Sequence, residues 1–275
     1  YKIGYVTGDS IKDKIPQLLK DGWTFPNFDY DGDFHSILDK IYNCNAYIGH
    51  EGIEQCLRDG ADVVITGRAA DSALFLAPLA YEFGWADNDW NNLARGIMAG
   101  HLLECGGQGA GGNYMYDWRN VPRMDELGFP IAELTDDTFE ITKAPDCGGV
   151  ICEQSCKEQF LYEVHDPANY LTPDVNVDIS KATITQVGPD RVRIGNVRGK
   201  QRPDTLKLCV GYHKGWKTVS MLSFAWPDAY EKAQYCAEVI MKKMARRGMK
   251  ADDVHISYIG VNSLHLGVAD MSEEA

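Results

Sequence analysis

The segment ADVVITGRAADSALF, residues 61–75, decides the fold that the sequence predicts. Residues 61–66 form an apolar run between glycines, which is typical of a buried parallel strand. Gly67 permits a sharp turn after this strand, and a helix is expected to begin near residues 69–71. A buried strand, a turn and a helix in this order indicate an α/β domain.

The flanking sequence continues this alternation. A short β run at residues 2–7 is followed by helical spacing over 11–20, 34–43 and 53–58. A longer helix is expected over about 89–105, where Asp87 or Asp89 can cap its start and Gly106-Gly107 can end it. We therefore predict an α/β fold with a layered, mostly parallel sheet.

The pattern changes near Pro173. Short β-like runs occupy residues 183–187, 191–194, 206–212 and 218–222, then a helix is expected over 228–247 and a strand over 255–259. Strands followed by a helix and a strand indicate a smaller α+β domain of the ferredoxin-like type. We predict domains at 1–175 and 176–270, with the boundary near 172–180.

Composition places limits on partners and location. The chain has 275 residues, 44% apolar and 24% charged, which is the balance of a globular protein. A net charge of −13 argues against non-specific nucleic-acid binding, and no stretch approaches the length of a membrane span. Eight scattered cysteines are expected to be free thiols in a reducing compartment, the cytoplasm or, in a eukaryote, the mitochondrial matrix. The chain begins at Tyr1, already in a strand-like run, so an N-terminal part is expected to be missing.

The first candidate site follows the strand at 61–66. In open α/β sheets the carboxyl ends of the strands are the usual ligand site, and Arg68 adds a bidentate donor for carboxylate or phosphate. Asp71 and Ser72 can contribute to binding or can simply cap the helix. Neither a G-x-G-x-x-G fingerprint nor a P-loop is present.

The second candidate is the segment GHLLECGGQ, residues 100–108. On a helix His101, Glu104 and Cys105 share one face. His101 can act as a general acid or base oriented by Glu104. Cys105 is the third catalytic candidate and can be a nucleophile if His101 lowers its pKa, although its place at a helix C-terminus disfavours the thiolate. The alternative is a buried histidine satisfied by Glu104, with Cys105 as a core residue.

Two further segments can contribute to binding. The loop GGQGAGG, residues 106–112, lets a backbone approach a ligand closely, so Gln108 and the N–H groups of Gly111 and Gly112 are candidates for substrate and oxyanion contacts. In residues 157–167, Tyr162 and His165 fall on one helical stripe with Glu158. These side chains can take part in acid–base catalysis, or they can simply form a solvent-exposed face of the helix.

The sequence does not predict a metal site. Cys147, Cys152 and Cys156 lack a usual zinc spacing. His35, His50, His101 and His165 are available, but no H-E-x-x-H pair places two ligands on one helical turn. A metal-dependent hydrolase is therefore only a third hypothesis, and no cofactor is expected.

Several long blocks resemble the acyclic terpene utilisation AtuA family, whose members are longer at the N-terminus. The blocks are ADVVITGRAADSAL (61–74), APLAYEFGW (77–85), DWNNLARGIMAGHLLECGGQ (89–108), GG (111–112), LGFPIAE (127–133), KEQFLYEVHDPANYLTPDV (157–175) and RVRIGNVRGKQRPDTLKLCVGY (191–212).

The resemblance implies a role in the breakdown of branched acyclic terpenoids as coenzyme A thioesters. We expect a lyase or hydratase acting on a branched acyl-CoA, with Arg68 holding an anionic group and His101 moving the proton. The alternative is a non-catalytic acyl-CoA-binding or assembly partner of a biotin-dependent acyl-CoA carboxylase. A homo-oligomer is expected in either case.

Overall fold

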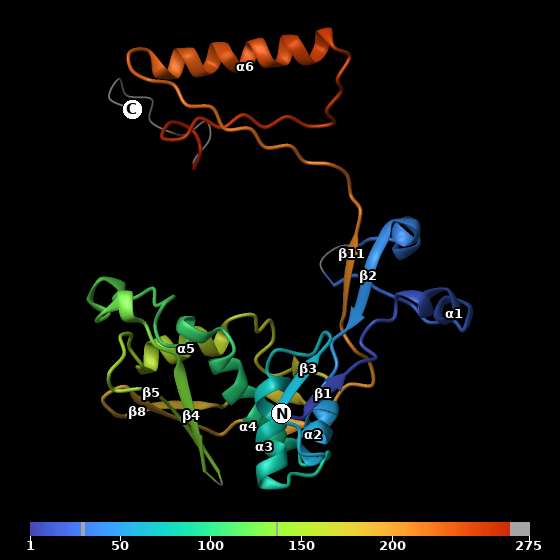
Figure 1. The fold of residues 1–275 in the computed structure, drawn as a ribbon. Coiled ribbons are helices and arrows are strands. Elements are labelled where there is room, and N and C mark those ends of the chain that lie inside the picture. Colours follow the sequence, from blue (N-terminus) through green and yellow to red (C-terminus); the bar gives the residue numbers. More distant parts are fainter. Residues whose placement is uncertain (29–30, 136, 265–275) are drawn as a thin grey trace. The chain divides into compact units, whose positions relative to one another are not determined.

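The computed structural model describes residues 1–28, 31–135 and 137–264 and shows a mixed α/β chain (Figure 1). Its contacts divide the chain into two compact units, Tyr1–Lys214 and Gly215–Ala275. The boundary expected near 172–180 falls inside the first unit, and as a statement about domains it stays a prediction.

Parallel pairing is limited to the start of the first unit. Strand β1 (Ile3–Val6) pairs with β3 (Val63–Thr66) in parallel register, and helix α2 (Glu51–Arg58) packs against both strands. The strand expected at 61–66 is therefore present, but it is not buried, because Val63 and Ile65 are 46% and 51% exposed. This sheet has only two strands among the described residues, so one face of β3 lacks a covering layer.

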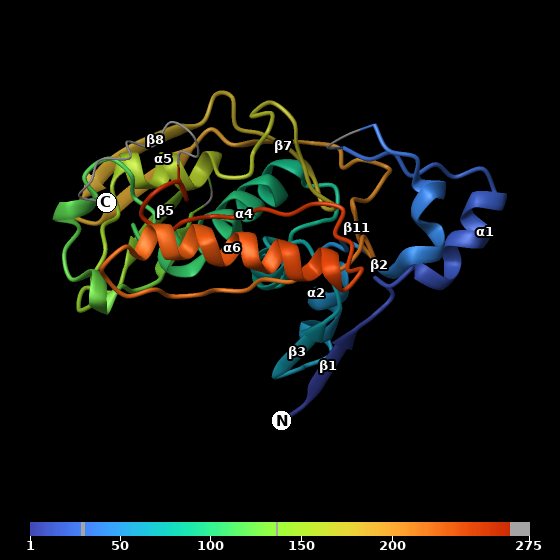
Figure 2. The same ribbon diagram turned by 90° about the horizontal axis from the view of Figure 1, so that it is seen from above.

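The other sheets are antiparallel, so the prediction of a layered, mostly parallel sheet is wrong. The largest has the order β4-β5-β9-β8, and a second has β10-β7-β6. Strand β11 pairs with β2, and the two lie side by side in Figure 1 and Figure 2. The reason lies in the connections: β4 and β5, like β8 and β9, are joined by a few residues, and short connections permit only antiparallel pairing. The bounds are β2 (Ile41–Ala46), β4 (Pro130–Leu134), β5 (Phe139–Lys143), β6 (Tyr170–Leu171), β7 (Asn176–Asp178), β8 (Thr183–Gly188), β9 (Arg191–Gly195), β10 (Arg198–Lys200) and β11 (Leu208–Tyr212).

The core of the first unit forms around helix α4 (Trp90–Leu103). Asp89 caps it by accepting a hydrogen bond from the Asn92 N–H at 3.4 Å, as the sequence suggested. Every residue from Leu93 to Leu102 is buried, and α4 contacts α3 (Ala73–Phe83), α5 (Glu153–Leu161), β4 and β5. The core is therefore built by a buried helix lying on an antiparallel sheet.

Helices at the two ends of the sequence match the expectations in part. Helix α1 (Ile15–Lys20) falls in the predicted segment 11–20, but the segment 34–43 divides into a short 3₁₀ helix, Phe34–Lys40, and the first residues of β2. In the second unit α6 (Ala229–Arg246) matches the helix predicted over 228–247.

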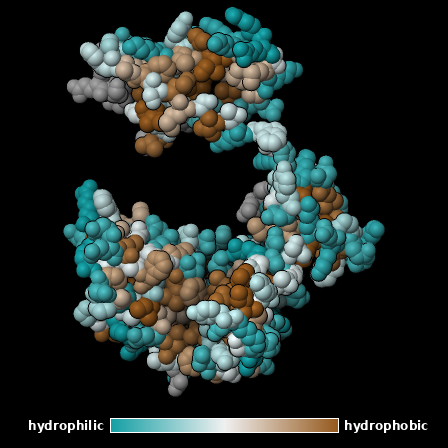
Figure 3. Space-filling view, in the orientation of Figure 1, coloured by the Kyte–Doolittle hydropathy of each residue, from teal (hydrophilic) through white to brown (hydrophobic). Residues whose placement is uncertain are grey.

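The strands predicted at 218–222 and 255–259 are not formed in the described part of the second unit. Residues 215–264 contain α6 and irregular chain, so a ferredoxin-like arrangement is not seen there. Apolar side chains remain at the surface, including Val219, Met221 and Ile259, which are 76%, 78% and 77% exposed. The brown areas of Figure 3 mark such apolar surface. An alternating apolar pattern forms a strand only where another strand accepts its hydrogen bonds.

None of the helices in the described residues combines the length and the apolar content needed to cross a bilayer.

Candidate functional site

The segments after β2 and β3 lie side by side. The N–H of Ile48 donates to the carbonyl of Arg68 at 3.3 Å, and the N–H of Ala70 donates to Ile48 at 2.9 Å. This short parallel bridge brings His50 and Arg68 to the same edge of the fold, although the two residues belong to separate strand ends.

Gly67 is required by a buried carboxylate. Asp9 lies just after β1 and accepts hydrogen bonds from the N–H of Arg68 at 2.8 Å and from the Asn45 amide at 2.7 Å. These hydrogen bonds lower the pKa of Asp9. A Cβ at residue 67 would lie 1.9 Å from Asp9 Oδ1, so only glycine allows this approach.

Arg68 is held on two sides. Its Nη2 donates to Asp71 at 2.5 Å, and its guanidinium carbon lies 4.2 Å from the centre of the Tyr47 ring. Its Nε is buried and has no hydrogen-bond partner among the described residues. The side chain of Arg68 is 34% exposed, so an anion can reach the guanidinium.

The segments of Arg68 and His101 converge, because the end of α4 packs on the start of α3. A Cβ at Gly100 would lie 2.9 Å from the carbonyl of Ser72. Ser72 is buried at the N-cap position of α3, but its side chain makes no capping hydrogen bond and instead bonds Tyr170. The Tyr170 ring centre lies 5.6 Å from that of His101, so Tyr170 links the two segments.

His101 is a buried, neutral imidazole. Burial lowers its pKa, while hydrogen bonds to the backbone carbonyls of Gln159 and Tyr162 and the charges of Glu163 and Asp71 act in the opposite direction. The ring is 2% exposed, and its Nε2 has no hydrogen-bond partner among the described residues. A neutral ring with one free nitrogen can accept a proton.

Glu104 does not orient His101. Helix α4 ends at Leu103, and the half-buried carboxylate of Glu104 accepts a hydrogen bond from the Cys105 thiol at 2.9 Å. Burial raises the pKa of Glu104. The backbone carbonyls of Gln159 and Tyr162 orient the His101 ring instead, so the role predicted for Glu104 is corrected.

Cys105 is predicted to be a poor nucleophile. Burial, followed by the hydrogen bond to Glu104, raises the pKa of its thiol to about 11. At pH 8 such a thiol is only about one part in a thousand thiolate. We expect iodoacetamide to label Cys105 far more slowly than the exposed Cys209, as measured by mass spectrometry of peptides over time. Equal labelling rates at the two positions would contradict this.

The glycine-rich loop packs on backbone rather than opening toward a ligand. The N–H of Gly111 donates to Gln108 at 3.1 Å, and that of Gly112 donates to Gly107 at 2.9 Å. A Cβ at Gly111, whose φ is +97°, would lie 2.9 Å from Val150. Because both N–H groups are already used within the loop, the predicted oxyanion contacts from Gly111 and Gly112 are not supported.

A small pocket lies beside the loop, with a volume of about 80 Å³. Gln108, Gly111, Gln159 and Tyr162 contribute to its lining. The Gln159 side chain accepts from Gln108 at 2.9 Å and donates to the His101 carbonyl at 3.1 Å. The pocket is thus joined to the backbone of His101 through one amide.

Tyr162 and His165 do not share a helical stripe. Helix α5 ends at Leu161, and Glu163 takes a φ of +59°, which breaks the helical path. Tyr162 remains at the rim of the pocket, whereas the exposed His165 lies outside the buried cluster around His101.

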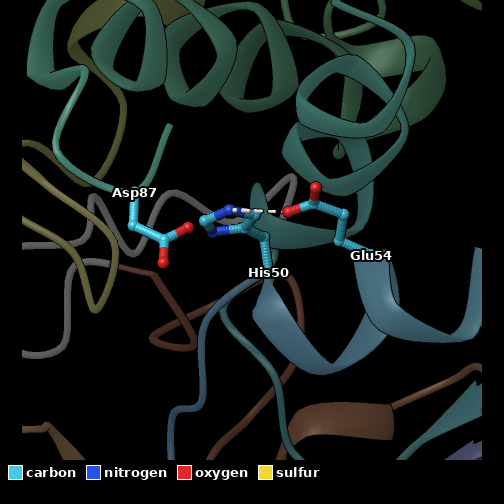
Figure 4. Close-up of side chains that lie close together, drawn as sticks. All are labelled: His50, Glu54 and Asp87. Carbon is cyan, nitrogen blue, oxygen red and sulfur yellow. Dashed lines mark ion pairs between the residues drawn. The ribbon is translucent and has the colours of Figure 1, made fainter. Parts of the chain in front are cut away.

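A second cluster surrounds His50, which the sequence offered only as an available histidine. Asp174 accepts hydrogen bonds from the backbone N–H of His50 at 2.8 Å and from its ring Nδ1 at 2.6 Å. The other ring nitrogen, Nε2, lies 3.5 Å from Glu54 Oε2, and Asp87 completes the group (Figure 4). The sequence predicts a helix that begins at residue 53, whereas α2 begins at Glu51 with His50 at its N-cap, and only this earlier start places His50 and Glu54 one turn apart.

Asp174 reaches His50 because residue 49 is glycine. A Cβ there would lie 2.1 Å from Asp174 Oδ1. Asp174 is 2% exposed, and its Oδ2 has no hydrogen-bond partner among the described residues. An ionised carboxylate only accepts, so the Asp174 contact places the ring proton of His50 on Nδ1.

The two buried histidines are expected to give opposite pH dependences of stability. Burial lowers the pKa of His50, but the hydrogen bond and charge of Asp174 and the charges of Glu54 and Glu51 outweigh it, so its pKa is raised. The stabilisation from His50 is complete below the unfolded pKa of about 6.5 and is lost as the pH rises through the folded pKa. The pKa of His101 is lowered, so the wild type loses stability as the pH falls below about 6.5.

Urea denaturation at pH 5.5 and 8.5 checks this sign. The loss of unfolding free energy caused by His50→Gln should be larger at pH 5.5. The loss caused by His101→Gln should be larger at pH 8.5. If both losses of unfolding free energy change with pH in the same direction, the raised pKa of His50 and the lowered pKa of His101 would be contradicted.

Comparison with known proteins gives one finding. No curated protein and no solved structure has a significant match to the chain. The sequence profile described as acyclic terpene utilisation family protein AtuA matches residues 1–275, and the chain therefore belongs to the AtuA family, which is linked to acyclic terpene utilisation.

Proposed function

We propose that the protein is an enzyme of acyclic terpenoid breakdown that carries out a lyase or hydratase reaction on a branched acyl-CoA. One observation carries this proposal: the neutral His101 has an unpartnered Nε2 and lies where the segment of Arg68, Asp71 and Ser72 meets the end of α4. A proton acceptor that lies near a segment carrying a guanidinium suits a substrate with an acidic carbon and a charged group.

In a hydratase step, water adds across the C2=C3 double bond of the thioester. His101 Nε2 accepts a proton from the water while the new C3–O bond forms, and the protonated His101 then returns this proton to C2, so the neutral imidazole is regenerated. Arg68 holds a carboxylate of the acyl group or a phosphate of coenzyme A through its guanidinium group. No cofactor is required, because the thioester itself stabilises the charge that develops at C2.

Turnover of branched enoyl-CoA and hydroxyacyl-CoA substrates by His101→Gln tests this assignment. General acid–base catalysis is worth about 10²–10⁴-fold in rate, and we expect a loss of that order in kcat. His35→Gln is the matched control, because His35 is exposed on a 3₁₀ helix. Unchanged turnover in His101→Gln would remove His101 from the mechanism.

Exposed apolar surface favours a second candidate function, a non-catalytic acyl-CoA-binding or assembly partner of a biotin-dependent carboxylase. Ile3, Tyr5, Val63 and Ile65 on the β1–β3 pair are all exposed, and exposed apolar groups of this kind mark protein interfaces. Native mass measurement with and without acyl-CoA, together with product analysis, separates the two functions. Stoichiometric binding or assembly with no product formed favours the second.

A further inference from the structure

We propose that His50, Glu54 and Asp87 bind a first-row divalent metal ion, with Asp174 as the residue that positions His50. The three ligand atoms all lie within 4.8 Å of one another, which permits one ion to contact all three. The site draws on the start of α2 and on the loop between α3 and α4, and neither segment belongs to the His101 cluster (Figure 4).

The orientation of His50 matches that of a metal-binding histidine. Its Nδ1–H donates to Asp174 at 2.6 Å, and this leaves Nε2 directed at Glu54. A carboxylate behind the ring fixes the tautomer and raises the basicity of the ligating nitrogen, and such partners accompany most histidine metal ligands. Gly49 allows the same carboxylate to accept a hydrogen bond from the backbone N–H of His50, so Asp174 holds this residue both at its backbone and at its ring.

Glu54 supplies one free carboxylate oxygen. Its Oε1 accepts hydrogen bonds from Arg58, with Nε at 3.0 Å, while Oε2 faces His50. Glu54 is 7% exposed, so this oxygen is held away from bulk water. Asp87 is exposed and forms the open side of the site, where water or a substrate oxygen can complete the coordination.

The charges around the site leave room for a cation. Glu54, Asp87 and Asp174 contribute three carboxylates, and Arg58 pairs with the first of them. The pKa of Arg202 is raised mainly by its hydrogen bond and ion pair with Glu51 at 2.6 Å, and the charges of Asp174 and Asp87 add to this shift. One imidazole and two carboxylates are a donor set suited to Zn²⁺ or Mn²⁺ rather than to Mg²⁺ with its many waters.

The ring protons of His50 can be accounted for when the metal ion binds. When His50 carries a proton on Nε2, the ion must replace it, so one proton passes to the buffer for each ion bound. The Nδ1 proton stays on the hydrogen bond to Asp174. A buried ion triad without metal, in which protonated His50 bridges Asp174 and Glu54, is the competing arrangement and predicts no stoichiometric binding of the ion.

Titration calorimetry of the EDTA-treated full chain with Zn²⁺ and with Mn²⁺ tests the proposal. We expect one equivalent of either ion to bind at pH 7. Asp87→Asn should weaken binding at least 10-fold while leaving the thermal midpoint of the metal-free chain unchanged. Asp174→Asn should weaken it about 10–100-fold.

The matched control is Asp33→Asn. Asp33 and His35 form an exposed carboxylate–imidazole pair at 3.1 Å, so general affinity of surface groups for the ion is measured there. Unchanged binding in Asp33→Asn and lost binding in Asp87→Asn support the site. Absence of a stoichiometric site in the wild type, or equal binding by wild type and Asp87→Asn, would overturn it.

Discussion

Asp174→Ala is expected to lower the free energy of unfolding by about 3–5 kcal/mol, the cost of removing one partner from a buried charged pair. The carboxylate is 2% exposed and accepts two hydrogen bonds from His50, at 2.8 Å and 2.6 Å. Its removal leaves a buried N–H and a buried imidazole N–H without an acceptor. Urea denaturation at pH 6.5 in the presence of EDTA measures this loss without any contribution from bound metal.

Two variants serve as controls for this measurement. Asp174→Asn keeps an acceptor oxygen and a similar volume but loses the charge. The loss of unfolding free energy in Asp174→Asn should therefore be smaller than that in Asp174→Ala. Asp13→Ala removes an exposed carboxylate from a short 3₁₀ helix and should stay within about 0.5 kcal/mol of wild type. A cost for Asp174→Ala no larger than that for Asp13→Ala would mean that His50 does not depend on this carboxylate.

The sequence alone predicted the helices better than the sheets. Helices α4 and α6 have strong periodicity and clear end signals, and both lie within a few residues of their expected bounds. Strands β4 and β5 lie in residues 113–150, where many turn residues obscure the strand pattern, and the first residues of β2 lie in a segment whose spacing predicts a helix. Strand pairing depends on partners far along the chain, such as β5 with β9, and local pattern does not contain that information.

In the candidate site, too, some residues could be predicted from local sequence and others could not. Arg68, Asp71 and His101 could be selected locally, because each lies at an expected strand or helix end, and their segments converge. Asp174 could not be assigned a partner, since it lies 124 residues from His50 along the chain. The glycine-rich sequence of residues 106–112 predicts contact with a ligand, but these glycines allow close packing of the backbone, and the two roles have the same sequence pattern.

Phe139→Ala is expected to cost about 3–5 kcal/mol of unfolding free energy, the range measured when a buried phenylalanine is removed from a core. Phe139 is fully buried at the start of β5, a strand with neighbours on both sides, and it belongs to the core cluster that includes Leu93 and Ile97 of α4. Chemical denaturation monitored by tryptophan fluorescence measures the loss. Phe28→Ala, at a side chain that is 86% exposed, is the matched control and should change stability by less than about 0.5 kcal/mol. Strand β5 connects the sheet to α4. Equal losses of unfolding free energy in Phe139→Ala and Phe28→Ala would therefore show that this sheet does not form part of the stabilising core of the first unit.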